Sequence, residues 1–119
     1  MTTIAKALNA AMADALAADP KVLVMGEDVG TLGGVFRITD GLKERFGGLR
    51  VIDTPLAESG IVGTAIGMAM RGYRPVAELQ FDGFTAPAFD QIVSQLARYR
   101  ARVGGRWSLP VTLLSLIHI

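Results

Sequence analysis

Apolar residues recur along the first twenty residues with the spacing of a helix. The members of this stripe are Ile4, Leu8, Met12 and Leu16, with alanines beside them. Thr2 and Thr3 are possible caps before the stripe, and Pro20 follows it, so we expect a helix that ends near Pro20 and packs by one face. Residues 21–27 (KVLVMGE) are a short β-branched and apolar run that glycine interrupts, which indicates a strand buried on both faces.

The rest of the chain continues this alternation of helix and strand. The pattern predicts helices over residues 40–46, 58–70 and 86–103, and strands over residues 50–53, 75–81 and from 110 to 113. Such alternation is typical of an α/β fold with right-handed crossovers and a mostly parallel sheet covered on both faces. Ligands of these sheets bind outside the carboxyl ends of the strands. Three loops are therefore candidates for a site: the one after Glu27, residues 54–58 and residues 81–85.

Composition limits the classes of function. The 119 residues, 50% of them hydrophobic, suit one domain with a genuine core. Twelve basic and eleven acidic residues, with no Lys or Arg run, argue against a nucleic-acid partner. There is no cysteine and the only histidine is His118, so we predict no disulfide and no metal site. The amino terminus lacks a signal-peptide pattern, and residues 59–70 are too short for a membrane span, so we expect a soluble cytoplasmic protein.

Two segments contain residues that could bind a ligand, and each also has a purely structural interpretation. The glycine-rich loop 26–34 (GEDVGTLGG) lacks the spacing of a nucleotide-binding loop, and Glu27 and Asp28 would repel a phosphate, so a turn with positive φ at some glycines is the simpler interpretation. Glu58 begins a helix whose later residues are mostly apolar or small. It either complements the helix dipole, or it lies beside an apolar wall and exchanges a proton with a bound heterocycle.

Other side chains also have either a structural or a binding interpretation. Phe81, Phe84 and Phe89 are either all in the core, or Phe84 lies at a tip and stacks on a planar ring. Gly63 and Gly67 lie four apart and predict close helix packing, inside the core or across a subunit interface. The arginines of residues 98–106 predict a solvated face and a docking surface.

The last six residues, 114–119 (LSLIHI), have two interpretations. They are either an ordinary apolar strand end or the translation of CTG TCT CTT ATA CAC ATC. That nucleotide sequence resembles a transposon-end adapter used in sequencing libraries. On the second interpretation residues 114–119 are a non-native tail, and His118 has no function.

Four blocks together resemble a known family: GEDVG, GGVFR, RVIDTPLAESGIVGTAIGMAMRGYRPVAELQF and AFDQIVSQLARYR. They are similar to the β subunit of the thiamine-diphosphate-dependent decarboxylating component of pyruvate and branched-chain 2-oxo acid dehydrogenases. The resemblance implies a transketolase-like pyrimidine-binding domain over residues 1–113, truncated at its carboxyl end. It also implies oxidative decarboxylation of a 2-oxo acid with acyl transfer to a lipoyl group, and a fragment that is inactive alone.

The resemblance implies partners and site residues as well. The partners are an α subunit, which holds Mg²⁺ and the cofactor diphosphate, a second β subunit and a lipoyl-bearing acyltransferase core. Glu58 matches the glutamate that pairs with the aminopyrimidine ring and promotes its imino tautomer, Phe84 matches an aromatic against that ring, and Glu27 matches an acid between two active sites. The chain reads FDGF where FADF is common, and it lacks the His-Ser segment that supplies a catalytic histidine. A transketolase-type ketol transferase and a non-catalytic docking module are the alternatives.

Overall fold

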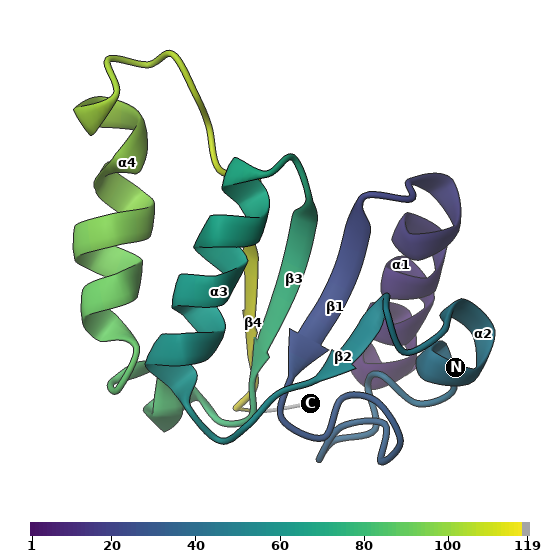
Figure 1. Cartoon of the computed structure of the whole chain (residues 1–119). Helices are drawn as coiled ribbons and strands as arrows, with labels where there is room; N and C mark the ends of the chain where they lie inside the picture. The colour runs from purple at the N-terminus through teal and green to yellow at the C-terminus, as the bar shows by residue number, and fades with distance from the viewer. Residues whose placement is uncertain (118–119) are drawn as a thin grey trace.

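The computed structural model describes residues 1–117 and contains a four-stranded sheet (Figure 1). The strands are β1 (Val22–Gly26), β2 (Val51–Asp53), β3 (Arg74–Leu79) and β4 (Thr112–Ser115). Their order across the sheet is β2-β1-β3-β4, and every neighbouring pair is parallel. All five residues of β1 are buried, as a central strand covered on both faces requires. The predicted α/β fold with a parallel sheet is confirmed.

Helices cover the two faces of the sheet (Figure 1). α1 (Ile4–Ala18) and α2 (Leu42–Phe46) lie on one face, and α3 (Glu58–Met70) and α4 (Ala97–Arg102) lie on the other. A short 3₁₀ helix, η1 (Asp82–Thr85), follows β3, and a π-helical segment, η2 (Gln91–Leu96), leads into α4. Over residues 1–117 no helix combines the length and apolar content that crossing a bilayer needs.

The first helix follows the prediction in its boundaries and only partly in its buried face. The Thr3 hydroxyl accepts a hydrogen bond of 3.2 Å from the Lys6 N–H, so Thr3 is the N-cap. The residues of α1 that are buried are Met12, Ala13 and Leu16. Ile4, expected in the apolar stripe, is exposed because the first turn of α1 extends beyond the core. The buried stripe therefore occupies the second half of the helix.

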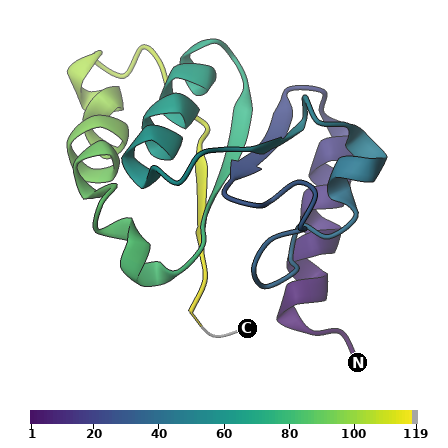
Figure 2. The same cartoon turned by 60° about the horizontal axis from the view of Figure 1, so that its bottom comes forward.

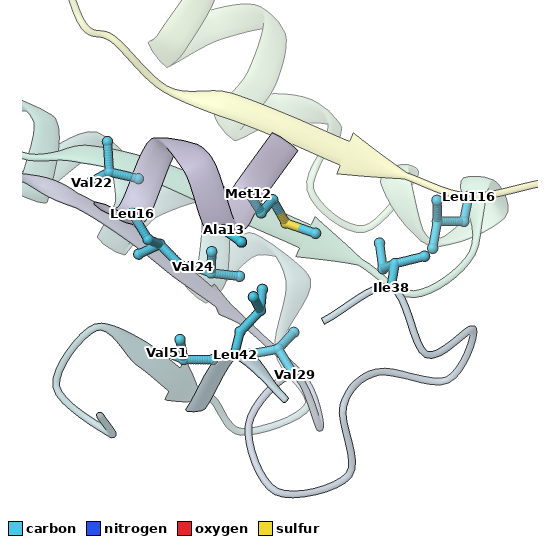
Figure 3. Packing of buried hydrophobic residues seen from close by; sticks show 10 residues of the cluster. All are labelled: Met12, Ala13, Leu16, Val22, Val24, Val29, Ile38, Leu42, Val51 and Leu116. Carbon is cyan, nitrogen blue, oxygen red and sulfur yellow. The ribbon is translucent and has the colours of Figure 1, made fainter. Parts of the chain in front are cut away.

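The core beneath α1 and α2 joins residues that are far apart in the sequence (Figure 3). Leu16 from α1, Val24 from β1 and Leu42 from α2 all have less than 3% of their surface exposed. Beside this core the Arg50 guanidinium donates hydrogen bonds to the carbonyl oxygens of Val22, Leu16 and Asp19 at 2.6, 2.9 and 2.9 Å. Arg50 thus fastens the end of α1 to the start of β1.

Beside the second core, beneath α3, lies a local conformation that the pattern did not predict. Residues 86–103 were expected to form an uninterrupted α-helix, but residues 91–96 are π-helical. This segment packs against α3 at Gly63, where a Cβ atom would lie 3.5 Å from Gln91 Oε1. A π turn accommodates an extra residue, and tertiary packing selects it where intrinsic helix propensity does not. The predicted helix packing is found at Gly63, as an ordinary van der Waals contact, but the prediction is wrong for Gly67, where a Cβ atom would meet no atom within 4 Å.

The last strand continues beyond the expected residues. Leu114 and Ser115 extend β4 beside Glu78 and Leu79 of β3. Leu116 is buried in the core beneath α1 (Figure 3), and its carbonyl oxygen accepts a hydrogen bond of 3.1 Å from the Asp82 N–H. The non-native origin of residues 114–119 stays a prediction, and His118 lies outside the described residues.

The closest approach between β1 and β3 gives a test of the fold. A Cβ atom at Gly26 would lie 2.8 Å from the carbonyl oxygen of Glu78 and 3.0 Å from Val29 Cγ1. We expect Gly26→Ala to lower the free energy of unfolding by about 2 kcal/mol because the two strands must move apart. Urea unfolding of the purified chain measures this change.

Gly67→Ala is the matched control for Gly26→Ala. A Cβ atom at Gly67 would meet no atom within 4 Å. Because Gly67 lies inside α3, the added methyl group should raise the stability of the chain by up to about 1 kcal/mol. Equal unfolding midpoints for the two variants would contradict the close contact between Gly26 and Glu78.

Candidate functional site

The parallel sheet brings the candidate loops to one edge, which Figure 2 shows turned toward the viewer. Gly26 at the end of β1 pairs with Asp53 at the end of β2 on one side and with Glu78 of β3 on the other. Glu27 follows β1 directly, and α3 begins at Glu58 after the short loop that follows β2. These acids therefore share the carboxyl edge of the sheet, where parallel α/β folds bind ligands.

Glu58 is the first residue of α3 and is buried, with 9% of its surface exposed. The preceding residue, Ala57, cannot cap the helix with its side chain, so Glu58 is the acid nearest the positive end of the helix dipole. Within residues 1–117 Glu58 takes part in none of the ion pairs, which join Arg37 to Asp40, Lys43 to Asp53 and Arg74 to Asp19. A buried carboxyl without a cationic partner in its own chain is suited to bind a group from outside.

Glu27 is buried close enough to Glu58 for the two charges to interact. Burial raises the pKa of Glu27, and the negative charges of Glu58 and Asp28 raise it further. Glu27 follows β1 directly and Glu58 begins α3, so both residues belong to the same carboxyl edge of the sheet. The structure thus brings together two of the three residues predicted for the site.

The third predicted residue, Phe84, belongs to a row of aromatic rings. Its ring meets that of Phe81 edge to face at 5.4 Å, and Phe81 meets Phe36 at the same centroid distance. Phe81, Phe84 and Phe89 are all exposed, with 42% exposure for Phe84, so the expectation that all three lie in the core is wrong. Phe84 lies in η1, just after the end of β3. Its exposed surface is available to a ligand ring.

Two neighbours of the site were not anticipated. Phe36 comes from the loop between β1 and α2, and its only sequence signal is its place after a glycine pair in GGVFR. Asp53 Oδ1 accepts a hydrogen bond of 2.6 Å from the Gly30 N–H, and Lys43 Nζ lies 3.2 Å from Asp53 Oδ2. Burial acts to raise the pKa of Asp53, but the hydrogen bonds from Gly30 and Lys43 outweigh it and lower the pKa.

These contacts fasten the glycine-rich loop to the end of β2. Gly33 and Gly34 have φ of +81° and +80°, so the interpretation of this loop as a turn with positive φ is confirmed. The loop then leads through Phe36 to the aromatic row. The contacts of Asp53 with Gly30 and Lys43 restrain this loop next to the carboxyl edge of the sheet.

An apolar cavity of about 370 Å³ lies beside the site, between the ends of β1 and β2 and the first turns of α3. Its lining includes Met25, Ile52, Ala57 and Gly60. Glu27, Glu58 and Phe84 are not among the lining residues. The cavity is therefore separate from the positions of the three predicted residues, although it lies at the same end of the sheet.

Residues 1–113 match the family described as "Transketolase, pyrimidine binding domain". The chain belongs to this family. The match covers all four strands up to Leu113 in β4, and it includes the positions of Glu27, Glu58 and Phe84.

The chain is similar to curated proteins that are β subunits of 2-oxo acid dehydrogenases. The chain is 66% identical over 108 residues to the pyruvate dehydrogenase E1 component subunit beta of Leifsonia xyli subsp. xyli, covering 91% of the chain and 32% of the relative. It is 59% identical over 111 residues to the 3-methyl-2-oxobutanoate dehydrogenase subunit beta of Mycobacterium tuberculosis. This match covers 93% of the chain and 32% of the relative. The chain is 53% identical over 113 residues to the pyruvate dehydrogenase E1 component subunit beta of Bacillus subtilis. This match covers 95% of the chain and 35% of the relative.

The chain thus spans about a third of the length of these relatives. The expected resemblance to β subunits of pyruvate and branched-chain 2-oxo acid dehydrogenases is confirmed, and so is the pyrimidine-binding fold. The roles of Glu27, Glu58 and Phe84 stay predictions.

The proximity of the two buried acids can be tested in the isolated chain. Glu58→Gln removes one of the charges that raise the pKa of Glu27, so that pKa should fall toward its ordinary value of 4.5. Carbon-13 NMR titration of the glutamate side chains measures the change. Glu44→Gln, at an exposed position of α2, is the control and should leave the pKa of Glu27 unchanged. An unmoved Glu27 titration in Glu58→Gln would show that the two groups lie apart.

Proposed function

We propose that this chain is part of the β subunit of a thiamine-diphosphate-dependent 2-oxo acid dehydrogenase and forms the pyrimidine side of its cofactor site. One observation carries the proposal: Glu58, in a chain of the pyrimidine-binding family, is a buried acid at the carboxyl edge of the sheet without an ion-pair partner within residues 1–117. The expected reaction is oxidative decarboxylation of a 2-oxo acid with acyl transfer to a lipoyl group.

The residues at the edge fit the pyrimidine half of the cofactor. An aminopyrimidine is a flat ring that is apolar on its faces and polar at its rim. The exposed face of Phe84 suits the ring, and the Glu58 carboxyl suits a ring nitrogen. When bound, thiamine diphosphate supplies the nucleophilic carbon that attacks the 2-oxo group and accepts the electrons of decarboxylation.

Glu58 would hold or exchange a proton at the pyrimidine ring nitrogen. Its burial would keep water away from that hydrogen bond, and its place in the first turn of α3 would set its direction. Glu27 would act on Glu58 through its charge. Burial raises the pKa of Glu27, and the negative charge of Glu58 raises it further.

Phe84 would orient the ring that Glu58 contacts. The edge-to-face contact with Phe81 would restrain the ring of Phe84, and a second such contact with Phe36 would restrain the ring of Phe81. A ring that lies on Phe84 would be restrained in the plane that Glu58 needs. Phe84 is therefore a positioning residue for the proposed proton exchange.

The proposed assembly contains further chains. An α subunit would hold the diphosphate and Mg²⁺, a second β subunit would complete the heterotetramer, and a lipoyl-bearing acyltransferase would receive the acyl group in the cytoplasm. The names of the relatives, which are subunits of larger enzymes, support a site that other chains complete. The relatives include pyruvate and 3-methyl-2-oxobutanoate dehydrogenases, so both 2-oxo acids are candidate substrates.

The test uses the full-length protein, extended from the source DNA and co-expressed with its α subunit. Glu58→Gln should lower thiamine-diphosphate-dependent decarboxylation of the better of the two candidate 2-oxo acids by about 10²- to 10⁴-fold, as loss of a proton-transfer group does. Turnover with an artificial electron acceptor measures this.

Glu44→Gln is the control, because Glu44 is an exposed acid in the first turn of α2. It should keep full turnover. If Glu58→Gln also kept full turnover, Glu58 would have no part in the mechanism. If a well-folded wild-type assembly had no activity, the docking-module alternative would be favoured, and ketol transfer between sugar phosphates would favour the transketolase alternative.

The role of Phe84 predicts a different effect in the same assembly. Phe84→Ala should weaken cofactor binding by about tenfold, because stacking on an aromatic ring contributes about 1 to 1.5 kcal/mol. Phe84→Tyr keeps the ring and should bind as the wild type does. Thiamine diphosphate titration followed by tryptophan fluorescence measures both variants. Equal affinities for alanine and tyrosine would remove Phe84 from the cofactor site.

A further inference from the structure

A second cavity lies at the opposite end of the sheet from the candidate site. The carboxyl-terminal ends of α3 and α4 are found at this amino edge, together with the segment that leads from α4 into β4 (Figure 1). The cavity has a volume of about 290 Å³. Its lining includes Met70 from the end of α3, Tyr99 from α4, and Trp107 and Leu109 from the segment before β4. None of these residues belongs to the proposed cofactor site.

The apolar side chains of this cavity are incompletely covered. Trp107 has 65% of its surface exposed and Met70 has 51%, while Tyr99 and Leu109 are half-buried. A partner that covered these side chains would gain their apolar surface for binding. Tryptophan, tyrosine, methionine and arginine are also the residue types enriched in protein interfaces. The composition of the cavity is therefore that of a binding surface.

Arg102 lies beside the cavity on α4. Its guanidinium Nη1 donates a hydrogen bond of 3.0 Å to Gln95 Oε1 in η2. Tyr99 comes four residues after Gln95 and three before Arg102, so the three side chains lie on one side of the helix. The positive charge of Arg102 is thus held next to Tyr99.

Two further arginines border the cavity. Arg71 directly follows Met70 as the C-cap of α3, and Arg106 directly precedes Trp107. Both are exposed, and Arg106 Nε donates a hydrogen bond of 3.1 Å to the carbonyl oxygen of Val103, at the end of α4. We call these three arginines, Arg71, Arg102 and Arg106, the basic rim.

The charge of the basic rim is not neutralised by the described part of the chain. Within residues 1–117 the three ion pairs are formed by other residues. The neighbouring sequence supplies no acid either, because residues 59–77 and 91–119 contain arginines and no Asp or Glu. Arginine binds carboxylates in a planar, two-pronged geometry. The rim is therefore complementary to a partner that carries carboxylates.

The size of the cavity indicates what enters it. Sites for small molecules have volumes of about 300 to 1,000 Å³ and enclose most of the ligand. This cavity is smaller and leaves Trp107 and Met70 exposed, so it suits one side chain of a larger partner. Single-stranded nucleic acids stack on successive aromatic rings along a basic groove, whereas here Tyr99 and Trp107 line one cavity. These features favour a peptide.

We propose that the basic rim and this cavity form a docking site for an acidic segment of a partner protein. One aliphatic or aromatic side chain of the segment enters the cavity beside Tyr99 and Trp107, and carboxylates on either side of it pair with the rim. Tryptophan, tyrosine and arginine contribute most of the binding energy in many interfaces. The docking site lies at the other end of the sheet from Glu58, so the proposal does not rest on the proposed function.

A synthetic peptide tests the proposal, with Trp107 as the reporter because it is the only tryptophan of the chain. A capped peptide with one leucine between two pairs of glutamates should change the Trp107 fluorescence until the site is saturated. Replacing its leucine by alanine should weaken binding about tenfold, because less apolar surface is buried. Replacing its glutamates by lysines should abolish binding, and added salt should weaken binding of the glutamate peptide.

Two variants make the test specific. Arg102→Gln combined with Arg106→Gln should weaken binding of the leucine peptide about tenfold and leave the melting temperature unchanged, because both side chains are exposed. Arg45→Gln is the matched control, since Arg45 is an exposed arginine of α2 on the other face of the sheet. Equal affinities for the double variant and this control would overturn the proposal, and so would equal affinities for the leucine and alanine peptides.

A nucleic-acid probe separates the two classes of acidic partner. An oligothymidylate of about ten nucleotides spans the length of strand that one single-strand-binding domain covers. It should bind more weakly than the leucine peptide. Tighter binding of the oligothymidylate, lost in the double arginine variant, would replace the protein partner by a nucleic acid.

The full-length protein with its α subunit gives a measurement that does not depend on the isolated chain. The leucine peptide, labelled with fluorescein and followed by anisotropy, should bind to this assembly as tightly as to the 119-residue chain. Absence of binding would show that another part of the enzyme covers the surface, and would overturn the proposal. Peptide binding by an assembly that lacks decarboxylase activity would support the docking site and contradict only the proposed function.

Discussion

The fold depends on the position of β1 at the centre of a parallel sheet. β1 pairs with β2 on one side and β3 on the other, so the ends of three strands are fixed relative to one another. At its last residue the fit is tight, because Gly26 approaches the backbone of Glu78 too closely for any side chain. This alignment places Glu27, Asp53 and the start of α3 along one edge. The proposed cofactor site depends on this placement.

The two faces of the sheet have different tasks. Beneath α3 the core is apolar, and the first residue of the helix, Glu58, lies at the edge. Beneath α1 and α2 the core also anchors polar structure: Arg50 holds the end of α1, and Asp53 and Lys43 restrain the glycine-rich loop. One face therefore orients the proposed reactive group, while the other maintains the loop beside it.

The order of elements and the location of the site could be read from the sequence, because hydrophobic periodicity and strand ends determine both. The buried half of α1, all of β1 and the first residue of α3 agree with the pattern. The π-helical segment could not be predicted, since it arises where Gln91 meets Gly63 of another helix. The contact between Phe36 and Phe81 likewise joins residues 45 positions apart. Neither leaves a local signal.

In the proposed assembly, Glu58 meets the pyrimidine ring of thiamine diphosphate at the carboxyl edge of the sheet. A crystal structure of the full-length protein with its α subunit and the cofactor tests this most directly. We expect a Glu58 carboxylate oxygen within about 3 Å of a pyrimidine nitrogen, a normal hydrogen-bond distance, with the ring on Phe84. A pyrimidine ring in the apolar cavity lined by Met25 and Ile52, with Glu58 contacting only protein, would contradict it.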